Sequence, residues 1–449
     1  MSSLLHAGLF RLAHRLRGST SLARLAEIRS NLSLDPAAAD ALQLKLLRDL
    51  LAHAEQHVPY YRDLFATIGL RAADIRSLRD FARVPVLTKA IVREQGDAMR
   101  SRLHPIDTLT RLNSGGSTGV PLSFLHDARY LAYSDAGTYR ALEQCGWTPG
   151  EMIAFVWGWN TRLEAMRSWE YELRQWLRRS YQLDPFQSDR ASMHAWVRRW
   201  RRVRPSVAYG YASTLGRFAT FLLEEGISLS PLRGAFVTAE KLLPEHRSAM
   251  EQAFQCRVFN CYGSSEVRNL AQECSLGRMH VNGDFGVIEN DASDDTAPVA
   301  PFIVTSLRSY GMPFIRYRNE DAGRTLEERC SCGNGFPLID LTIARVADHF
   351  TLPGGRIVHG EYFTHLMYGA KGIDLFQFHQ TAPGAITLWI VPTPGQEAAR
   401  KETLARVVRE LAQVGTVPLQ VQVREVDAIP LSSAGKHRFT RSDVPMETA

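Results

Sequence analysis

The chain has 449 residues, 45% of them hydrophobic and 22% charged, a composition typical of a globular protein long enough for two or three domains. Its formal net charge of +6 is a mild basic excess, and without a nucleic-acid-binding motif it indicates no nucleic acid partner. No run approaches the roughly 20 apolar residues that span a bilayer, and six cysteines in so long a chain exclude a disulfide scaffold, so we expect a cytoplasmic protein with reduced thiols.

The first 100 residues read as helical. Residues 1–30 contain five arginines and one acid, with leucines at roughly helical spacing. This pattern predicts a surface helix packed on its own domain. A transit peptide, or a helix in peripheral contact with a membrane, is the alternative. Residues 36–100 are predicted to form helices with a polar outer face.

The middle of the chain alternates between two kinds of pattern. The apolar runs "MIAFVWGW" (152–159) and "APFIVTSL" (300–307) are typical of strands, and "WEYELRQWLRRSY" (169–181) is typical of a helix. Alternating strands and helices over residues 120–344 predict an α/β domain with several layers.

The last hundred residues predict a smaller α+β domain. Residues 385–392 and 418–426 alternate like strands, and residues 395–415 between them read as a helix ending at Gly415. The residues predicted to face inward are Ile386, Leu388 and Ile390, then Leu404, Val407, Val408 and Leu411, then Leu419, Val421 and Val423. We therefore expect one domain over residues 1–344 and a second over residues 345–449.

Four short segments carry most of the functional signal, although each alone is a common turn or surface pattern. In chain order they are "NSGGSTGVP" (113–121), "YGSSE" (262–266), "IRYRNEDAG" (315–323) and "IPLSSAGKHRF" (429–439). Together with "HVPYYRDLF" (57–65) and "TAEKL" (238–242), they resemble the adenylate-forming superfamily and, within it, the phenylacetate–CoA ligase-like branch. Members associated with capsule and other polysaccharide pathways look most similar.

The resemblance implies a large α/β domain, a small mobile C-terminal domain and a reaction in two steps. A carboxylate attacks the α-phosphate of ATP to give an acyl-adenylate, and a thiol, usually coenzyme A, then displaces AMP. Two anions must meet in the first step, so positioned N–H groups, Mg²⁺ and a cation are needed. Homodimers are common in this branch.

The resemblance also assigns roles to residues. Lys436 would bridge the carboxylate and ATP, Glu266 would coordinate Mg²⁺, and Thr118 would act with the phosphate loop. Tyr262 would pack against adenine, Asp321 would accept both ribose hydroxyls, and Arg345 would open the hinge between the domains. The expected ATP and AMP contacts are Ser114, Gly115, Gly116, Ser117, Thr118, Gly119, Glu240, Tyr262, Gly263, Ser264, Ser265, Asp321 and Arg345.

Three positions depart from the family pattern. Val120 stands where a lysine is frequent in the phosphate loop, which removes a cation but not the backbone cradle. In the hinge, Ala344 replaces a glycine, and Asp348 is a single acid where the family has an acidic pair.

Several of these residues also have ordinary structural readings. Glu266 could be an acid at a helix N-terminus, Glu240 a solvated turn carboxylate, and Asp321 an ion-pair partner of Arg318 or Arg324. Lys436 could be a surface lysine, although a mobile loop favours the catalytic role. Trp157, Trp159 and Tyr211 fall where the branch builds its acyl pocket, and core packing explains them equally well.

A separate set of residues suggests a metal site. Cys274 and His280, and Cys330 and Cys332, supply three thiols and one imidazole, a complete tetrahedral set for structural Zn²⁺ if the fold joins the two pairs. Free cysteines are the alternative. The remaining three cysteines, Cys145, Cys256 and Cys261, read as small core residues.

Three functions remain open on this basis. The first is an ATP-dependent carboxylate–CoA ligase. The second is an adenylate-forming transferase that passes its group to an acceptor other than CoA. The third is a non-catalytic homologue that binds nucleotide, which would have no need of Thr118, Glu266, Asp321 and Lys436.

Overall fold

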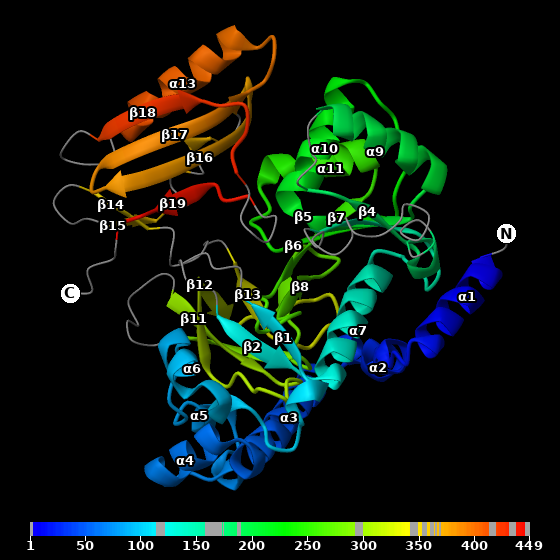
Figure 1. Ribbon diagram of the computed structural model, residues 1–449, viewed down its shortest axis with the longest axis vertical. Coiled ribbons are helices and arrows are strands. Elements are labelled where there is room, and N and C mark those ends of the chain that lie inside the picture. Colours follow the sequence, from blue (N-terminus) through cyan, green and yellow to red (C-terminus); the bar gives the residue numbers. More distant parts are fainter. Residues whose placement is uncertain are drawn as a thin grey trace.

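The structure is a computed structural model. It describes residues 3–113, 122–157, 173, 175–185, 190–291, 300–341, 349–352, 357–359, 363, 366–367, 370–412, 419–430 and 437–444. An 11-stranded sheet organises a large domain, and a four-stranded sheet organises a smaller C-terminal domain (Figure 1). The predicted α/β class, with a small α+β domain at the C-terminus, is confirmed.

The first helix, α1 (Ser3–Leu16), is amphipathic as predicted. Phe10 and His14 are buried, whereas Leu12 and Leu16 are 50% and 79% exposed. Phe10 packs edge-on against Trp147 at a ring distance of 5.9 Å, which fixes the helix to the large domain. In the described part of the chain, no helix combines the length and apolar character that a membrane crossing requires. Peripheral membrane contact stays a prediction.

The helical prediction for residues 36–100 is also confirmed. The Asp35 carboxylate accepts the Ala38 N–H at 2.9 Å and Pro36 occupies the first turn, so the sequence itself starts the long helix α3. Gly69, with φ of +63°, ends the next helix in the left-handed conformation. The helices are α2 (Ser21–Ile28), α3 (Pro36–His57), α4 (Pro59–Ile68), α5 (Leu78–Phe81) and α6 (Lys89–Gln95).

The central sheet has the strand order β10-β11-β12-β13-β9-β8-β7-β6-β5-β3-β4. Strands β4, β3, β5, β6 and β7 pair in parallel, and β7 to β13 pair antiparallel. The parallel strands are β3 (Ile153–Val156), β4 (Ser180–Leu183), β5 (Val207–Tyr211), β6 (Gly234–Thr238) and β7 (Arg257–Tyr262). The others are β8 (Ala271–Glu273), β9 (Met279–Val281), β10 (Gly286–Asn290), β11 (Ala300–Ser306), β12 (Tyr317–Leu326) and β13 (Leu338–Asp340).

Helices cover both faces of the parallel half of this sheet. Ala154 and Val156 belong to a core with α9 (Arg190–Val203), α10 (Ala212–Glu224) and α11 (Pro244–Phe254). Ile153 and Val207 belong to a core with Phe10 and α7 (Ala128–Gln144). Burial on both faces explains the nearly continuous apolar runs of these strands.

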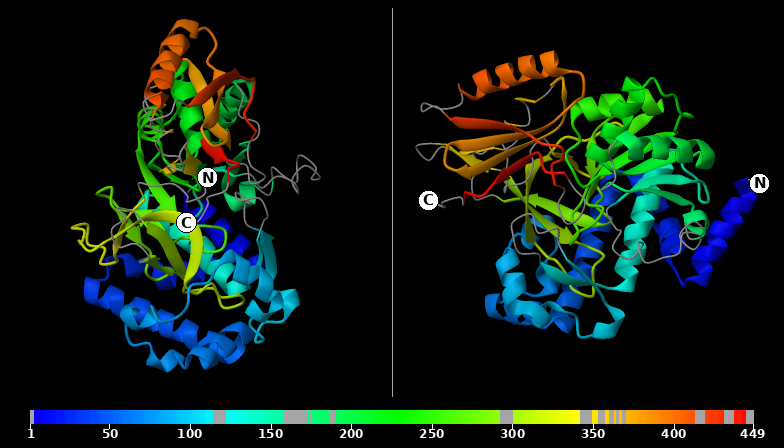
Figure 2. Two further views of the ribbon diagram at one scale, coloured as in Figure 1. Left: turned by 90° about the vertical axis from the view of Figure 1, so that its left-hand side faces the viewer. Right: turned by 45° about the horizontal axis from the view of Figure 1, so that its top comes forward.

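The C-terminal sheet has the order β18-β17-β16-β19, with α13 packed on one face (Figure 2). Its elements are β16 (Ile373–Ala382), β17 (Ala385–Pro392), α13 (Glu397–Leu411), β18 (Gln420–Glu425) and β19 (Thr440–Ser442), preceded by the hairpin β14 (His349–Thr351) and β15 (Ile357–His359). Both predicted strands and the predicted helix are confirmed.

One inward-facing residue of that helix was predicted wrongly. Val407 and Leu411 are fully buried, but Val408 is 40% exposed, and Thr403 lies inside in its place. Helix α13 connects the parallel neighbours β17 and β18 and packs against their sheet. Contact with this sheet decides which residues of the helix are buried, and the buried stripe is narrower than the helical periodicity suggests. The proposed stop at Gly415 lies outside the described residues.

Candidate active site

The candidate site lies at the carboxyl ends of the parallel strands. The pairing of Tyr211 with Thr238, and of Thr238 with Cys261, places the ends of β5, β6 and β7 side by side. Trp157, Glu240 and Tyr262 therefore emerge at one edge of the sheet, where open α/β sheets bind their ligands.

Tyr262 and Asp321 form the centre of a hydrogen-bond network. The Tyr262 hydroxyl donates to Asp321 Oδ2 at 2.9 Å, and Asn319 Nδ2 donates to the Tyr262 oxygen at 2.7 Å and to Asp321 Oδ2 at 3.1 Å. The alternative partners of Asp321 are engaged elsewhere, since Arg318 pairs with Asp291 and Arg324 lies 3.7 Å from Asp340. Two motifs that are distant in the sequence thus share one set of contacts.

The segment that carries Glu266 folds into a tight turn after β7. The Ser264 N–H donates to the Val267 carbonyl at 2.9 Å, and the Val267 N–H donates to the Ser264 hydroxyl at 3.1 Å. A side chain on Gly263 would meet the Asn269 nitrogen at 2.9 Å, so glycine is required for this close approach. No helix starts in residues 262–270, so the reading of Glu266 as a helix N-terminal acid is wrong.

Glu266 is a buried acid of an unusual kind. The residue is only 5% exposed, and its carboxylate accepts no hydrogen bond from the described residues. Its oxygens are not among the fully buried polar atoms that lack a partner, so they keep some contact with solvent. A carboxylate that keeps little contact with solvent and accepts no hydrogen bond is stabilised by a nearby cation. A hard oxygen ligand in this state fits Mg²⁺, so the chemistry of the site agrees with the ion that the sequence suggests.

The β-hairpin that flanks the predicted phosphate loop contacts the Glu266 turn through His126. Strands β1 (Thr110–Asn113) and β2 (Ser123–His126) pair with Asn113 opposite Ser123. The His126 ring nitrogen Nε2 lies 3.2 Å from the Ser265 carbonyl oxygen, and burial lowers the pKa of this histidine to about 4. The loop itself lies outside the described residues, namely Ser114, Gly115, Gly116, Ser117, Thr118, Gly119 and Val120.

Two of the three predicted acyl-pocket residues lie together. The rings of Trp157 and Tyr211 are 4.9 Å apart, and a further stack with Tyr209 and Phe155 runs across β3 and β5. Tyr211 is 1% exposed, and both residues pack against the apolar cluster with α9 to α11, as the core reading expects. Trp159 lies outside the described residues.

Glu240 follows β6 on a strained piece of backbone. Ala239 has φ of +71°, a conformation that costs an alanine about 1 kcal/mol or more. Glu240 accepts the Ser213 N–H at 2.9 Å and the His437 N–H at 2.8 Å. Burial lowers the pKa of the neighbouring Lys241 to about 8.

Four residues with predicted roles in the catalytic loop and the hinge lie outside the described residues: Lys436, Arg345, Ala344 and Asp348. The residue that directly follows Lys436, His437, is described.

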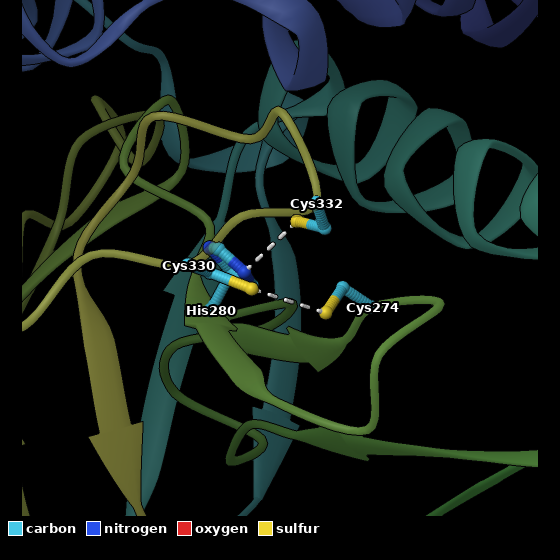
Figure 3. Close-up of side chains that lie close together, drawn as sticks. All are labelled: Cys274, His280, Cys330 and Cys332. Carbon is cyan, nitrogen blue, oxygen red and sulfur yellow. Dashed lines mark hydrogen bonds between the residues drawn. The ribbon is translucent and has the colours of Figure 1, made fainter.

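The predicted metal-binding residues meet as a second centre. Figure 3 shows Cys274, His280, Cys330 and Cys332 pointing toward one another, and their ligand atoms all lie within 4.8 Å of each other. The Cys274 and Cys330 Sγ atoms are 3.9 Å apart, and Cys332 Sγ lies 3.4 Å from His280 Nε2. Regular tetrahedral zinc coordination would separate two sulfurs by about 3.8 Å, and sulfur from nitrogen by about 3.5 Å.

The surroundings of this cluster also suit a metal. His280 Nδ1 lies 3.1 Å from the Phe336 carbonyl oxygen, which leaves Nε2 facing the three sulfurs. The Leu276 and Asn334 N–H groups donate to the sulfurs of Cys274 and Cys332. The cluster joins the β8–β9 hairpin to the segment before β13 and lies away from the parallel strand ends.

The other three cysteines behave as core residues. Cys145 is 3% exposed, and burial raises its pKa. Burial also raises the pKa of Cys256 and of Cys261 to about 12, so neither is a thiolate near neutral pH.

Three contact residues of the site were not singled out from the sequence: Asn319, His126 and His437. Asn319 lies within the "RNED" motif, so its neighbour Asp321 was the available signal. For His126 and His437 the sequence contained no such signal, because their partners Ser265 and Glu240 are far from them in the chain.

The architecture of the chain is similar to that of adenylate-forming enzymes. No protein-family model matches the sequence. Protein CapK of Staphylococcus aureus is 22% identical over 421 residues, covering 90% of this chain and 89% of that protein. Phenylacetate-coenzyme A ligase of Thermus thermophilus is 25% identical over 331 residues, which cover 71% of this chain and 72% of that protein. The resemblance to the phenylacetate–CoA ligase-like branch is confirmed.

A solved structure has the same fold. The 2-hydroxyisobutyryl-CoA ligase in its postadenylation state matches with a TM-score of 0.71 at 20% identity, covering 92% of this chain and 91% of that chain. The same enzyme in its thioesterification state matches with a TM-score of 0.58.

Proposed function

We propose that the protein is an AMP-forming acid–thiol ligase that activates a carboxylic acid through an acyl-adenylate and transfers the acyl group to a thiol, coenzyme A. The observation that carries this proposal is the hydrogen bond between Tyr262 and Asp321, because these are the two residues that the sequence motifs assign to adenine packing and to ribose binding. Relatives named as phenylacetate-coenzyme A ligases support it.

In the first step a carboxylate oxygen bonds to the α-phosphorus of ATP, and the bond to pyrophosphate breaks. Tyr262 and Asp321 would hold the nucleoside, the residues from Ser114 to Gly119 would bind the phosphates, and Lys436 would bridge the two anions. Glu266 would hold Mg²⁺, which when bound there supplies positive charge to the phosphate oxygens. Trp157, Trp159 and Tyr211 would line the acyl pocket, and the hinge at Arg345 would let the C-terminal domain turn for the second step.

A panel of aryl and fatty carboxylates tests this function. We expect ATP–pyrophosphate exchange with at least one acid, followed by AMP release that depends on coenzyme A. Exchange without coenzyme A dependence would instead favour a transferase with another acceptor. Protein CapK, which aligns over more of the chain than the CoA ligases do, is not named as a CoA ligase. An absence of both exchange and ATP binding would contradict both.

Asp321→Asn should weaken ATP binding by about 10- to 100-fold, because an amide cannot accept both ribose hydroxyls as a carboxylate does. Calorimetry with ATP and 2′-deoxy-ATP measures the effect, and the difference in affinity between the two nucleotides should narrow in the variant. Asp340→Asn, at the end of β13 beside Arg324, is the matched control. An unchanged preference for ATP would remove Asp321 from the ribose site.

We further propose that Cys274, His280, Cys330 and Cys332 bind one structural Zn²⁺, since four ligands leave no open position for catalysis. Purified protein should contain about one equivalent of zinc, and Cys330→Ser should lose it and lower the Tm by about 2 °C, a loss of roughly 2 kcal/mol. Cys256→Ser, outside the cluster, should keep the metal. Protein without zinc that keeps its Tm in a chelator would contradict the site.

A further inference from the structure

The Glu240 carboxylate connects the two domains. Its Oε2 atom accepts the N–H of Ser213 in the first turn of α10, at 2.9 Å, and its Oε1 atom accepts the N–H of His437, at 2.8 Å. Ser213 and Glu240 belong to the large domain, whereas His437 belongs to the C-terminal domain and directly follows Lys436.

His437 is in turn fixed to its own domain. Its ring nitrogen Nε2 lies 2.8 Å from the Phe376 carbonyl oxygen in β16, and its ring packs edge-on against Phe439 at 4.6 Å. Burial lowers the pKa of this imidazole to about 4, so the ring is neutral near pH 7 and donates to the carbonyl. The His437 N–H therefore moves together with the C-terminal sheet. Its hydrogen bond to Glu240 forms only when that sheet lies in this position against the large domain.

The two bonds of Glu240 differ in what they depend on. The bond to Ser213 satisfies a helix N-terminal N–H, and it lies entirely within the large domain. The bond to His437 exists only when the C-terminal domain lies as it does here. A charge-assisted bond present in one arrangement and absent from another stabilises the first arrangement alone.

We propose that Glu240 is a positioning residue: its carboxylate holds the backbone that follows Lys436 against the large domain and so seats Lys436 for adenylation. This inference rests on the proposed function of Lys436. This positioning role is distinct from the nucleotide contact that the sequence suggests, and it rests on the two backbone N–H groups that the carboxylate oxygens accept. Glu240 should matter for adenylation and not for the transfer step, which requires the C-terminal domain to leave this position.

Glu240→Gln tests the proposal, since an amide has one acceptor oxygen and cannot accept both N–H groups. Hydrogen exchange of a peptide that begins several residues before His437 and ends at residue 444, read by mass spectrometry, should speed up about ten-fold at the His437 N–H. ATP–pyrophosphate exchange should lose about ten-fold in kcat, whereas AMP affinity should stay within about two-fold. Thioester formation from a supplied acyl-adenylate and coenzyme A should keep its rate.

The matched control is Glu251→Gln on α11. Glu251 Oε1 accepts the Val258 N–H at 3.1 Å, a similar bond with both ends inside the large domain. This variant should leave the exchange of residues 437–444 and the kcat of adenylation unchanged. Glu240→Asp, which keeps the charge but shortens the reach, should resemble Glu240→Gln.

Unchanged protection of residues 437–444 in Glu240→Gln would overturn the proposal. Weaker AMP binding with normal kcat would also overturn it and would make Glu240 a nucleotide ligand. If the native protein activates no acid at all, the proposed function fails, yet the hydrogen-exchange comparison still tests whether Glu240 holds the C-terminal segment.

Discussion

Lys436→Ala is expected to lower the rate of ATP–pyrophosphate exchange by at least about 100-fold, an effect of the size seen when one transition-state charge contact is removed. The Lys436 ammonium group would neutralise the substrate carboxylate and the ATP phosphates only as they approach each other. Its removal should therefore lower kcat. ATP affinity should remain within about two-fold, because the proposed nucleotide contacts are Tyr262, Asp321 and the phosphate loop, which the substitution leaves intact. Exchange kinetics and calorimetry on the same preparation measure both quantities.

Lys401→Ala provides the control for charge. Lys401 is exposed on α13, in the same domain, and its removal should change neither quantity. Equal exchange by the native protein and Lys436→Ala would remove this lysine from the mechanism. A loss of ATP affinity equal to the loss of rate would make it a binding residue.

Glu266→Gln is expected to lower exchange by about 100-fold and to raise the Mg²⁺ concentration needed for half-maximal rate. Because the carboxylate is buried without a hydrogen-bond partner among the described residues, its neutral replacement should leave the Tm unchanged or raise it. A Mg²⁺ titration of exchange and a thermal melt without nucleotide measure the two effects.

Glu273 offers a close comparison with Glu266. Both residues are 5% exposed, but Glu273 accepts hydrogen bonds from Arg247 at 2.8 Å and from the Asn260 N–H at 2.9 Å. Glu273→Gln should therefore lower the Tm and leave the Mg²⁺ dependence unchanged. If Glu266→Gln behaves in the same way, Glu266 is a structural acid and the proposed Mg²⁺ site is wrong.

Local patterns predicted much of the fold. Strand β17 coincides with the predicted 385–392, and Ile386, Leu388 and Ile390 all face the core, because alternation along a strand is a local property. Val408 was placed wrongly because the buried stripe of a helix depends on the sheet beneath it. The order of the strands, including the long antiparallel half of the central sheet, had no counterpart in the local patterns.

The residues of the candidate site could likewise be predicted from local motifs, whereas the contacts between them could not. Motif resemblance singled out Tyr262, Glu266 and Asp321, but the bonds that join them to other elements depend on the fold. The contact of Glu240 with His437 spans 197 positions, and no spacing rule reaches that far. The two Cys/His pairs meet because β9 pairs with β13, a neighbour relation that the sequence alone could not supply.

The central claim is that a carboxylate oxygen bonds to the α-phosphorus of ATP. The most direct test uses an acid found active in the panel, labelled with ¹⁸O in its carboxylate, and follows the label by mass spectrometry. Attack at the α-phosphorus forms the new P–O bond from the acid oxygen, and thiol attack at the carbonyl then leaves that oxygen on AMP. The account predicts AMP carrying ¹⁸O from the acid, and unlabelled AMP formed alongside thioester would contradict it.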